Sequence, residues 1–242
     1  MTEKQREIVE RQFAIDYNCK IEDFQNKETL VTLRRPSGDA RRFEEESFLS
    51  ILSYNGKLVI NAAEEIFPWC NEVLAKRISA EWGFEVGSLI SIDKKLQEYG
   101  YGIDNAHVFF LPKYEAEERD VELRVLEKEE IKALEEDERI DEAFLFEDYI
   151  EDILGVAAYE EGEMVAVAGA TANSYEMWEL GVNSFVEGKG YGQAVLSALV
   201  KEVQKRGKVP YTGTALSHCA SQNISLRAGL VPSFCELRAN KL

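Results

Sequence analysis

The chain is poor in the side chains that bind zinc or form disulfide frameworks. Its 242 residues include only two histidines, His107 and His218, and four cysteines that stand far apart without a CxxC pair. A structural zinc site needs about four such ligands at short spacings, and a disulfide framework needs paired cysteines. We therefore expect no metal site and a reducing, cytoplasmic setting.

Long apolar runs and an excess of positive charge are also missing. The best apolar runs, 153–159 and 164–172, have the length of strands, and the charged N-terminal segment lacks the apolar core of a signal sequence. Lys and Arg number 28 against 45 Asp and Glu, which gives a net charge of −17. This charge would repel nucleic acid. The composition predicts a globular protein without a membrane or nucleic-acid partner.

The negative charge is concentrated in one part of the chain. Residues 122–163 carry 17 acidic and 4 basic side chains, whereas residues 164–242 carry 5 acidic and 8 basic ones. The balance is therefore −13 in the first segment and +3 in the second, so a polyanionic ligand would be tolerated in the second. The acidic segment either steers a ligand or only keeps the protein in solution.

The first half of the chain has the pattern of a mixed α/β unit. A strand is predicted at 29–34, a turn at 36–39, and a hairpin at 48–60 with Asn55-Gly56 as its turn. Helices are expected from Pro68 onwards and over 92–99, followed by a strand at 108–111. A charged linker, 112–120, ends this half.

The second half begins with a strand and continues through acidic helices into a meander. We expect a strand at 122–126, helices at 128–136 and 142–149, and antiparallel strands at 155–159, 164–172 and 175–183. A helix at 191–206, a strand at 209–216, a short helix at 220–227 and a last strand at 231–239 follow.

A glycine-rich turn is the strongest functional signal. Gly188, Gly190 and Gly192 alternate between a strand that ends near 183 and the helix that follows. Glycines at a helix start leave backbone N–H groups accessible, and the helix dipole favours an anion there. The turn therefore predicts a phosphate site. Its spacing differs from the GxxxxGK[ST] of a P-loop and from the GxGxxG of a dinucleotide fold.

The order of elements and two motifs resemble the GNAT acyltransferase superfamily. Gly190 and Gly192 match the glycines of its [Q/R]-x-x-G-x-[G/A] signature, while Glu187 departs from it at the Gln/Arg position. The segment from Asn223 to Leu230 resembles the second motif, a short helix that contains Asn and ends in glycine. The resemblance covers about 122–239.

The resemblance implies an α/β (α+β) chain with two domains. Residues 120–242 are expected to form an acyl-CoA N-acyltransferase fold with a mixed, mostly antiparallel sheet. Residues 1–115 would form an N-terminal mixed α/β domain, which loosely resembles the extra domain of two-domain bacterial members. The role of this domain is not predicted.

The implied co-substrate is acetyl-CoA. In the superfamily the strand before the glycine turn parts from the next strand, and its free backbone groups hold the pantetheine arm. The Val182 N–H is then the expected oxyanion donor. Gly181 either lets the thioester lie close to the strand or forms a β-bulge, and Asn223 either binds pantetheine or caps a helix. The residues expected to bind acetyl-CoA are Leu180, Gly181, Val182, Gly188, Lys189, Gly190, Tyr191, Gly192, Gln193 and Asn223.

The attacking amine must lose a proton, and carboxylates are available for this. Glu176 and Glu179 are predicted on one strand, where alternation puts them on opposite faces. Glu176 lies six residues before Val182, where histone acetyltransferases of the superfamily carry their base, so it is favoured over Glu179. His218 is a third candidate. The superfamily's acid tyrosine has no counterpart, and Ser225 is the nearest hydroxyl.

The acceptor is expected to be a small cationic amine. By resemblance the acidic segment 128–149 lines the acceptor side, and its negative charge attracts cations. Two other functions stay open: an acyl-CoA-binding or regulatory module without turnover, and a role carried by the N-terminal half. A homodimer is also left open.

Overall fold

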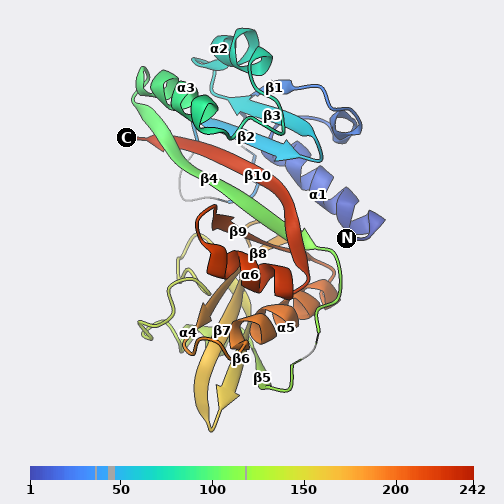
Figure 1. Ribbon diagram of the computed structural model, residues 1–242, viewed down its shortest axis with the longest axis vertical. Coiled ribbons are helices and arrows are strands. Elements are labelled where there is room, and N and C mark those ends of the chain that lie inside the picture. The colour runs from blue at the N-terminus through green and yellow to red at the C-terminus, as the bar shows by residue number, and fades with distance from the viewer. Residues whose placement is uncertain (36, 43–46, 118) are drawn as a thin grey trace. The chain divides into compact units, whose positions relative to one another are not determined.

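The computed structural model describes residues 1–35, 37–42, 47–117 and 119–242, and these form two compact units (Figure 1). Unit one comprises Met1–Ile8 and Phe110–Pro232, and unit two comprises Val9–Phe109 and Ser233–Leu242. The sequence predicts a single break between 115 and 120, whereas the chain leaves unit two at Phe109 and returns to it at Ser233. Pro36, in the expected turn at 36–39, and Glu118, in the expected linker, lie outside the described residues.

Unit two is built on a sheet with the strand order β1-β3-β2-β10-β4. β2 pairs antiparallel with β3 and with β10, and β1 pairs parallel with β3. The β2–β3 hairpin forms as predicted because Asn55 and Gly56 both adopt positive φ, at 50° and 76°, as a two-residue turn requires. The strands are β1 (Leu30–Leu33), β2 (Leu49–Tyr54), β3 (Lys57–Ala62), β4 (Tyr101–Pro112) and β10 (Leu230–Lys241).

The helices of unit two differ in length from those predicted. The helix expected from Pro68 onwards is broken after Glu72, and the second helix begins earlier than 92. The first helix is not predicted above and begins with a capping box: the Gln5 N–H donates to Thr2 Oγ1 at 3.2 Å, and Gln5 Oε1 accepts from the Thr2 N–H at 2.8 Å. The helices are α1 (Glu3–Asp16), which belongs to unit two from Val9 onwards, the 3-10 helices η1 (Ile21–Gln25) and η2 (Leu74–Lys76), α2 (Phe67–Glu72) and α3 (Val86–Gln97).

A buried ion cluster lies in unit two. The Arg41 guanidinium donates to Asp16 at 2.5 Å and to Glu236, whose carboxylate also accepts a hydrogen bond of 2.8 Å from the Tyr17 hydroxyl. Burial raises the pKa of Glu236, but the charges of Arg41 and Arg238 outweigh burial and hold that pKa below its usual value. Glu236 is therefore held in its charged form inside the unit.

Unit one contains a mixed, mostly antiparallel sheet of strand order β9-β8-β7-β6-β5, as the resemblance implied. Strands β5 to β8 are antiparallel neighbours, and β9 is parallel to β8. The strands are β5 (Glu122–Leu126), β6 (Asp152–Glu160), β7 (Glu163–Thr171), β8 (Met177–Ser184) and β9 (Val209–Ala215). The helices are α4 (Lys128–Lys132), α5 (Tyr191–Lys205) and α6 (Cys219–Arg227).

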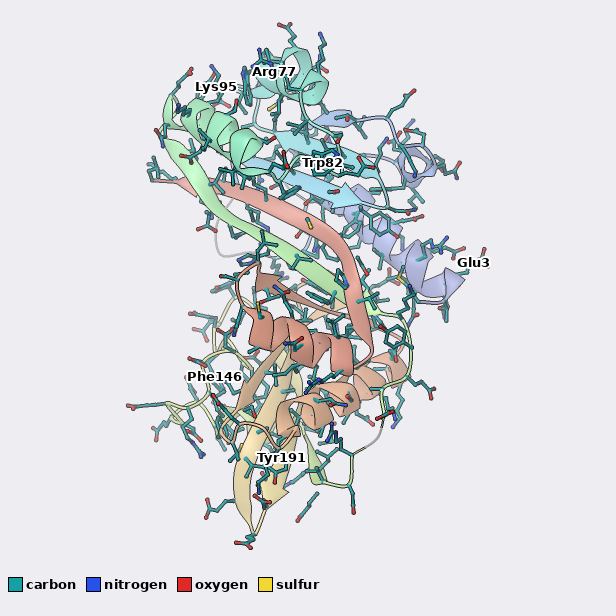
Figure 2. The ribbon with its side chains drawn as sticks, in the orientation of Figure 1. Glu3, Arg77, Trp82, Lys95, Phe146 and Tyr191 are labelled. Atoms are coloured by element: carbon teal, nitrogen blue, oxygen red, sulfur yellow. The ribbon has the colours of Figure 1, made fainter. Side chains whose placement is uncertain are left out.

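The helix predicted at 142–149 is wrong, because this segment has no regular structure. Phe146, labelled in Figure 2, has a positive φ of 53°, which a helix does not allow. The Asp152 carboxylate accepts the N–H groups of Leu145 and Phe146, and the Asn183 side chain accepts those of Glu142 and Ala143. Side chains from the sheet thus satisfy the backbone donors that a helix would otherwise satisfy.

Candidate active site

The site is centred on the point where two neighbouring strands part. β8 and β9 are in register only at Met177–Val209, Trp178–Pro210 and Glu179–Tyr211, whereas β8 stays paired with β7 as far as Ser184. Beyond Glu179 the two strands therefore separate while β8 remains anchored on its other side. This parting of the strands is what the resemblance implied.

The backbone groups of β8 that face this opening follow from its pairing with β7. The Phe185 N–H donates to the Val165 carbonyl at 2.9 Å, and neighbouring residues of an antiparallel strand point their backbone groups in alternate directions. Counting back by twos, Asn183 and Gly181 face β7. Leu180 and Val182 therefore turn their N–H and C=O groups toward the opening, within reach of a ligand.

The glycine turn forms the second wall. Gly188 and Gly190 have φ values of 78° and 81°, which favour glycine, and Gly190 is the residue from which α5 begins. The first N–H groups of a helix have no partner inside it, and the helix dipole adds positive potential at the same place. The turn therefore presents donors at one end of the opening.

Both walls line one cavity of about 510 Å³, together with residues of β9 and α6. It brings together most residues that were predicted to bind acetyl-CoA, and His218 as well. These are Leu180, Gly181, Val182, Gly188, Gly190, Tyr191, Gly192, Gln193, Asn223 and His218. Four predicted residues, Lys189, Glu176, Glu179 and Ser225, are not among its lining residues.

Lys189 and Ser225 each have a partner elsewhere. The Lys189 ammonium lies 3.3 Å from the Glu160 carboxylate at the end of β6. Hydrogen bonds from Tyr191 and Lys189 lower the pKa of Glu160. The buried Ser225 hydroxyl donates to the Ser221 carbonyl at 2.9 Å, within α6. This is the partner that a serine hydroxyl inside a helix commonly finds in its own preceding turn.

The two carboxylates predicted on one strand lie at its start and within it. Glu176 precedes β8 by one residue, and its carbonyl accepts the Val209 N–H at 2.8 Å, next to the first register pair of β8 and β9. Glu179 lies on β8 at the last register pair before the strands part. Its carboxylate accepts hydrogen bonds from the Asn173 amide at 2.6 Å and the Tyr211 hydroxyl at 3.2 Å. Glu179 is therefore the carboxylate held at the fork.

Gly181 is not a β-bulge, because it pairs in register with Gly169, and a close approach of another segment requires glycine here. A Cβ on Gly181 would lie 1.7 Å from the Glu142 carbonyl oxygen, and one on its cross-strand partner Gly169 would lie 2.0 Å from the Ala143 carbonyl oxygen. Only glycine at these positions lets the segment around Glu142 lie directly on the sheet. By alternation Glu179 projects from the same face as Gly181, toward this segment.

Charged side chains that the sequence analysis missed adjoin the cavity. Arg227 on α6 lines it, four residues after Asn223, a spacing that puts both on one helix face. Arg119 donates to Gln193 Oε1 at 3.1 Å, and its guanidinium carbon lies 3.2 Å from where a Cβ on Gly190 would be. The spacing on α6 could have revealed Arg227. Nothing local points to Arg119, which lies 74 residues before Gln193.

The cavity also has acidic lining. Glu142 and Glu187 both line it and are exposed. Glu187 stands where the superfamily has Gln or Arg, while Arg227 lines the cavity and Arg119 lies beside Gly190. Glu142 lies at the other end, beside Gly181. Acidic side chains thus line the cavity both at the glycine turn and beside Gly181.

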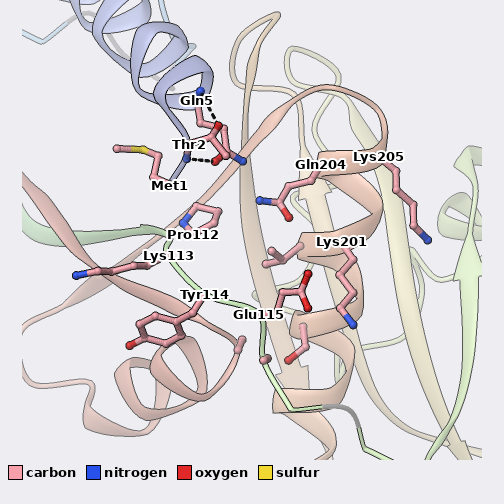
Figure 3. A pocket seen from close by; sticks show the side chains of 14 residues that line it. Met1, Thr2, Gln5, Pro112, Lys113, Tyr114, Glu115, Lys201, Gln204 and Lys205 are labelled. Atoms are coloured by element: carbon pink, nitrogen blue, oxygen red, sulfur yellow. Dashed lines mark hydrogen bonds between the residues drawn. The ribbon is translucent and has the colours of Figure 1, made fainter.

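A larger cavity, of about 770 Å³, lies along α5 from Ser197 to Lys205 (Figure 3). Lysines and a glutamate share its wall, and the Thr2–Gln5 hydrogen bonds are at its rim. Neither the parted strands nor the glycine turn belongs to its lining as the structure describes it. The smaller cavity is therefore the candidate active site.

Two kinds of feature are absent from the described residues. No group of three or more His, Cys, Asp or Glu side chains there could hold a metal ion. Likewise, no helix in the described part of the chain is long and apolar enough to cross a membrane.

Solved acetyltransferases are distantly similar to the chain. A GCN5-related N-acetyltransferase from Kribbella flavida is 17% identical with a TM-score of 0.46, over 60% of this chain and 62% of that one. A GNAT-family acetyltransferase from Colwellia psychrerythraea is 12% identical with a TM-score of 0.43, over 59% and 57%. A Salmonella typhimurium protein, solved with its cofactor acetyl-CoA, is 19% identical with a TM-score of 0.31, over 37% and 64%.

None of the curated proteins compared with this chain matches it. Residues 120–229 match the model of the family described as "Acetyltransferase (GNAT) family". This range includes the parted strands, the glycine turn and α6, which make up the cavity. The part of unit one that carries the cavity is thus the part that matches the GNAT acetyltransferase family.

Proposed function

We propose that the protein moves an acetyl group from acetyl-CoA to a primary amine by direct attack. The observation that carries this proposal is the opening between β8 and β9, where Leu180 and Val182 turn backbone groups toward a cavity that ends at a glycine turn. A long ligand with a phosphate at one end and amide groups along its arm matches that arrangement.

The phosphates of acetyl-CoA are bound by the N–H groups of Gly188–Gly192 and by nearby arginine. Arg227 lines the cavity, and Arg119 is held beside Gly190 by its hydrogen bond to Gln193. Lys189 has its charge paired with Glu160 instead. The arginines thus supply the positive charge that the Glu187 departure removes from the motif.

The acetyl carbonyl oxygen accepts a hydrogen bond from the Val182 N–H, which stabilises the charge that develops on it. Glu179, at the fork, takes the proton as the amine nitrogen bonds to the carbonyl carbon. The carbon–sulfur bond then breaks, and the CoA thiolate takes a proton from solvent. His218, which lines the cavity, is the alternative base.

The acceptor is a small cationic amine. Glu142 lines the cavity on the face to which Glu179 projects, and it belongs to the acidic segment 122–163, whose balance is −13. Negative potential around an opening raises the local concentration of cations. The acceptor thus approaches from this face and acetyl-CoA from the glycine turn.

Calorimetry with CoA and an assay for free thiol test the proposal. Wild type should bind CoA and release thiol from acetyl-CoA with at least one member of an amine panel. Arg227→Gln should raise the Kd for CoA about tenfold, since a charge-assisted bond is lost. Lys189→Gln, on the same turn but paired with Glu160, is the matched control and should bind as wild type does. No heat with CoA would refute the proposal.

A second pair of variants separates catalysis from binding. Glu179→Gln should lower kcat/KM about 100-fold or more, because the general base is removed, and should leave CoA affinity unchanged. Glu176→Gln, which lies outside the strand, should retain activity. Binding without thiol release, unaffected by either variant, would favour the alternative of an acyl-CoA-binding module without turnover.

A further inference from the structure

A row of exposed apolar side chains runs along helix α3 in unit two. Ile92 and Leu96 are buried on one side of this helix, whereas Val86 and Ile90 are exposed on another side. Trp82, in the turn before the helix, continues the row. Trp82, Val86 and Ile90 are 65%, 72% and 50% exposed. With Lys94 they recur every four residues, and we call Trp82, Val86, Ile90 and Lys94 the α3 row.

The α3 row is open to another helix. Single exposed apolar residues are ordinary, but a contiguous row that includes a tryptophan marks an interaction surface. Gly87 and Ser91 beside it are small and exposed, and a Cβ on Gly87 would meet nothing within 4 Å. A second helix can therefore approach the row closely.

The charges at the two ends of the row are opposite. Glu81 and Glu85 flank Trp82, and Lys94 ends the row. Figure 2 shows Trp82 and Lys95 toward opposite ends of α3. Within the described part of the chain, neither Glu81, Glu85 nor Lys94 has an ion pair or a side-chain hydrogen bond. If a second copy of the row packed antiparallel to the first, Lys94 of each copy would lie against Glu81 and Glu85 of the other.

We infer that the α3 row docks against the same row of a second copy of this chain, antiparallel and related by a two-fold axis. With the axis at residue 88, Val86 meets Ile90 of the copy, and Lys94 meets Trp82 and the two glutamates of the copy. Each contact occurs twice, as an isologous interface requires. Cation–π and ionic contacts at both ends then fix the direction of the pair.

The expected dimer is weak. A single helix pair buries less surface than a standard interface, which places the Kd in the micromolar range. Each copy carries a net charge of −17, so the copies repel each other at long range. At about 0.15 M salt charges more than about 8 Å apart are largely screened, so the test belongs at that ionic strength or above.

Sedimentation velocity over a range of concentrations tests the association. Wild type should pass from monomer to dimer as its concentration rises, and Val86→Asp combined with Ile90→Asp should remain monomeric. Both side chains are exposed, so circular dichroism and the melting temperature should stay unchanged. A wild type that is monomeric up to millimolar concentration, or a dimer unaffected by these substitutions, overturns the inference.

Charge reversal tests the antiparallel register. Lys94→Glu alone, and Glu81→Lys with Glu85→Lys, should each weaken self-association about tenfold, because like charges meet twice. A mixture of these two variants should form a heterodimer, since every facing pair is then opposite in sign. Lys76→Glu, an exposed lysine on η2, is the control with the same change of charge. Failure of the mixture to associate better than either variant alone overturns the antiparallel arrangement.

Discussion

At Gly181 the demand for glycine comes from a neighbour and not from the backbone angle. The Glu142 carbonyl oxygen occupies the place that a Cβ would take, at 1.7 Å. Gly181→Ala should therefore push the segment around Glu142 off the sheet and lower the free energy of unfolding by about 1–3 kcal/mol. Urea denaturation measures this. Gly38→Ala, where a Cβ would meet nothing within 4 Å, is the control, and equal stabilities of the two variants would contradict the explanation.

Glu236 links the stability of unit two to pH. Its pKa in the folded protein is lower than in the unfolded chain, where it is about 4.3, because the charges of Arg41 and Arg238 outweigh the effect of burial. The ionised Glu236 therefore contributes its full stabilisation at a pH above its pKa in the unfolded chain. This contribution is lost as the pH falls through the pKa of Glu236 in the folded protein.

Removing the Glu236 charge should therefore have two effects. Glu236→Gln leaves Arg41 with less compensation in the interior and should lower the free energy of unfolding at pH 7 by about 3 kcal/mol. It should also flatten the decline in stability between pH 5 and 3, measured by urea denaturation. Glu98→Gln removes an exposed ion pair with Lys95 and should change little. If the stability of wild type and of Glu236→Gln declined in parallel with falling pH, the buried ion cluster would not be the source of that decline.

At the scale of elements, the sequence was sufficient where local signals decide the structure. Asn55-Gly56 and the alternating glycines before α5 both demand positive φ, and both turns form as predicted. The helix predicted over 142–149 does not form. Its acidic composition favours a helix, but Asn183 and Asp152, which lie outside the segment, accept its backbone N–H groups instead. Arg119 was missed for the same reason, since its partner Gln193 is 74 residues away. Contacts remote in sequence leave no local signal.

Asn183 holds the first residues of the segment 141–146 on the sheet, while Asp152 holds Leu145 and Phe146. The Asn183 side-chain oxygen accepts the N–H groups of Glu142 and Ala143 at 3.0 and 2.8 Å. Asn183→Ala should speed hydrogen exchange at these two amides about tenfold, since each loses a bond of about 1 kcal/mol or more. If Glu142 faces the acceptor, the acceptor KM should rise while the KM for acetyl-CoA stays constant. Asn105→Ala, at a half-buried asparagine in unit two, is the control, and unchanged exchange in Asn183→Ala would contradict this role.

At the scale of the whole molecule, the composition indicated a globular α/β protein. It did not indicate which segments of the chain make up each unit. The sequence predicts a break between 115 and 120 because the linker is charged, yet the last residues of the chain belong to unit two. Strand β10 pairs with β2 over Phe234–Ala239, and its apolar residues would suit either unit equally well. Only the pairing of β10 with β2 shows that β10 joins the sheet of unit two. The hydrophobic pattern of a single strand does not determine which strand it pairs with.

The distribution of charge over the molecule leads to a prediction about ionic strength. The segment 122–163 keeps its balance of −13 even though Arg124, Lys128 and Arg139 are paired within it. A diamine acceptor is attracted by this field, and screening should raise its KM about threefold or more between 0.05 and 0.5 M salt, with acetyl-CoA saturating.

The amino alcohol of the same chain length is the matched acceptor for this experiment. It keeps the attacking amine but replaces the second ammonium with a hydroxyl, so its KM should depend less on salt. The difference between the two salt slopes then measures the attraction of the remote charge alone, free of any effect of salt on folding or on CoA binding. Equal slopes would mean that the acidic segment does not face the acceptor, and Glu142 would then be an ordinary solvated carboxylate.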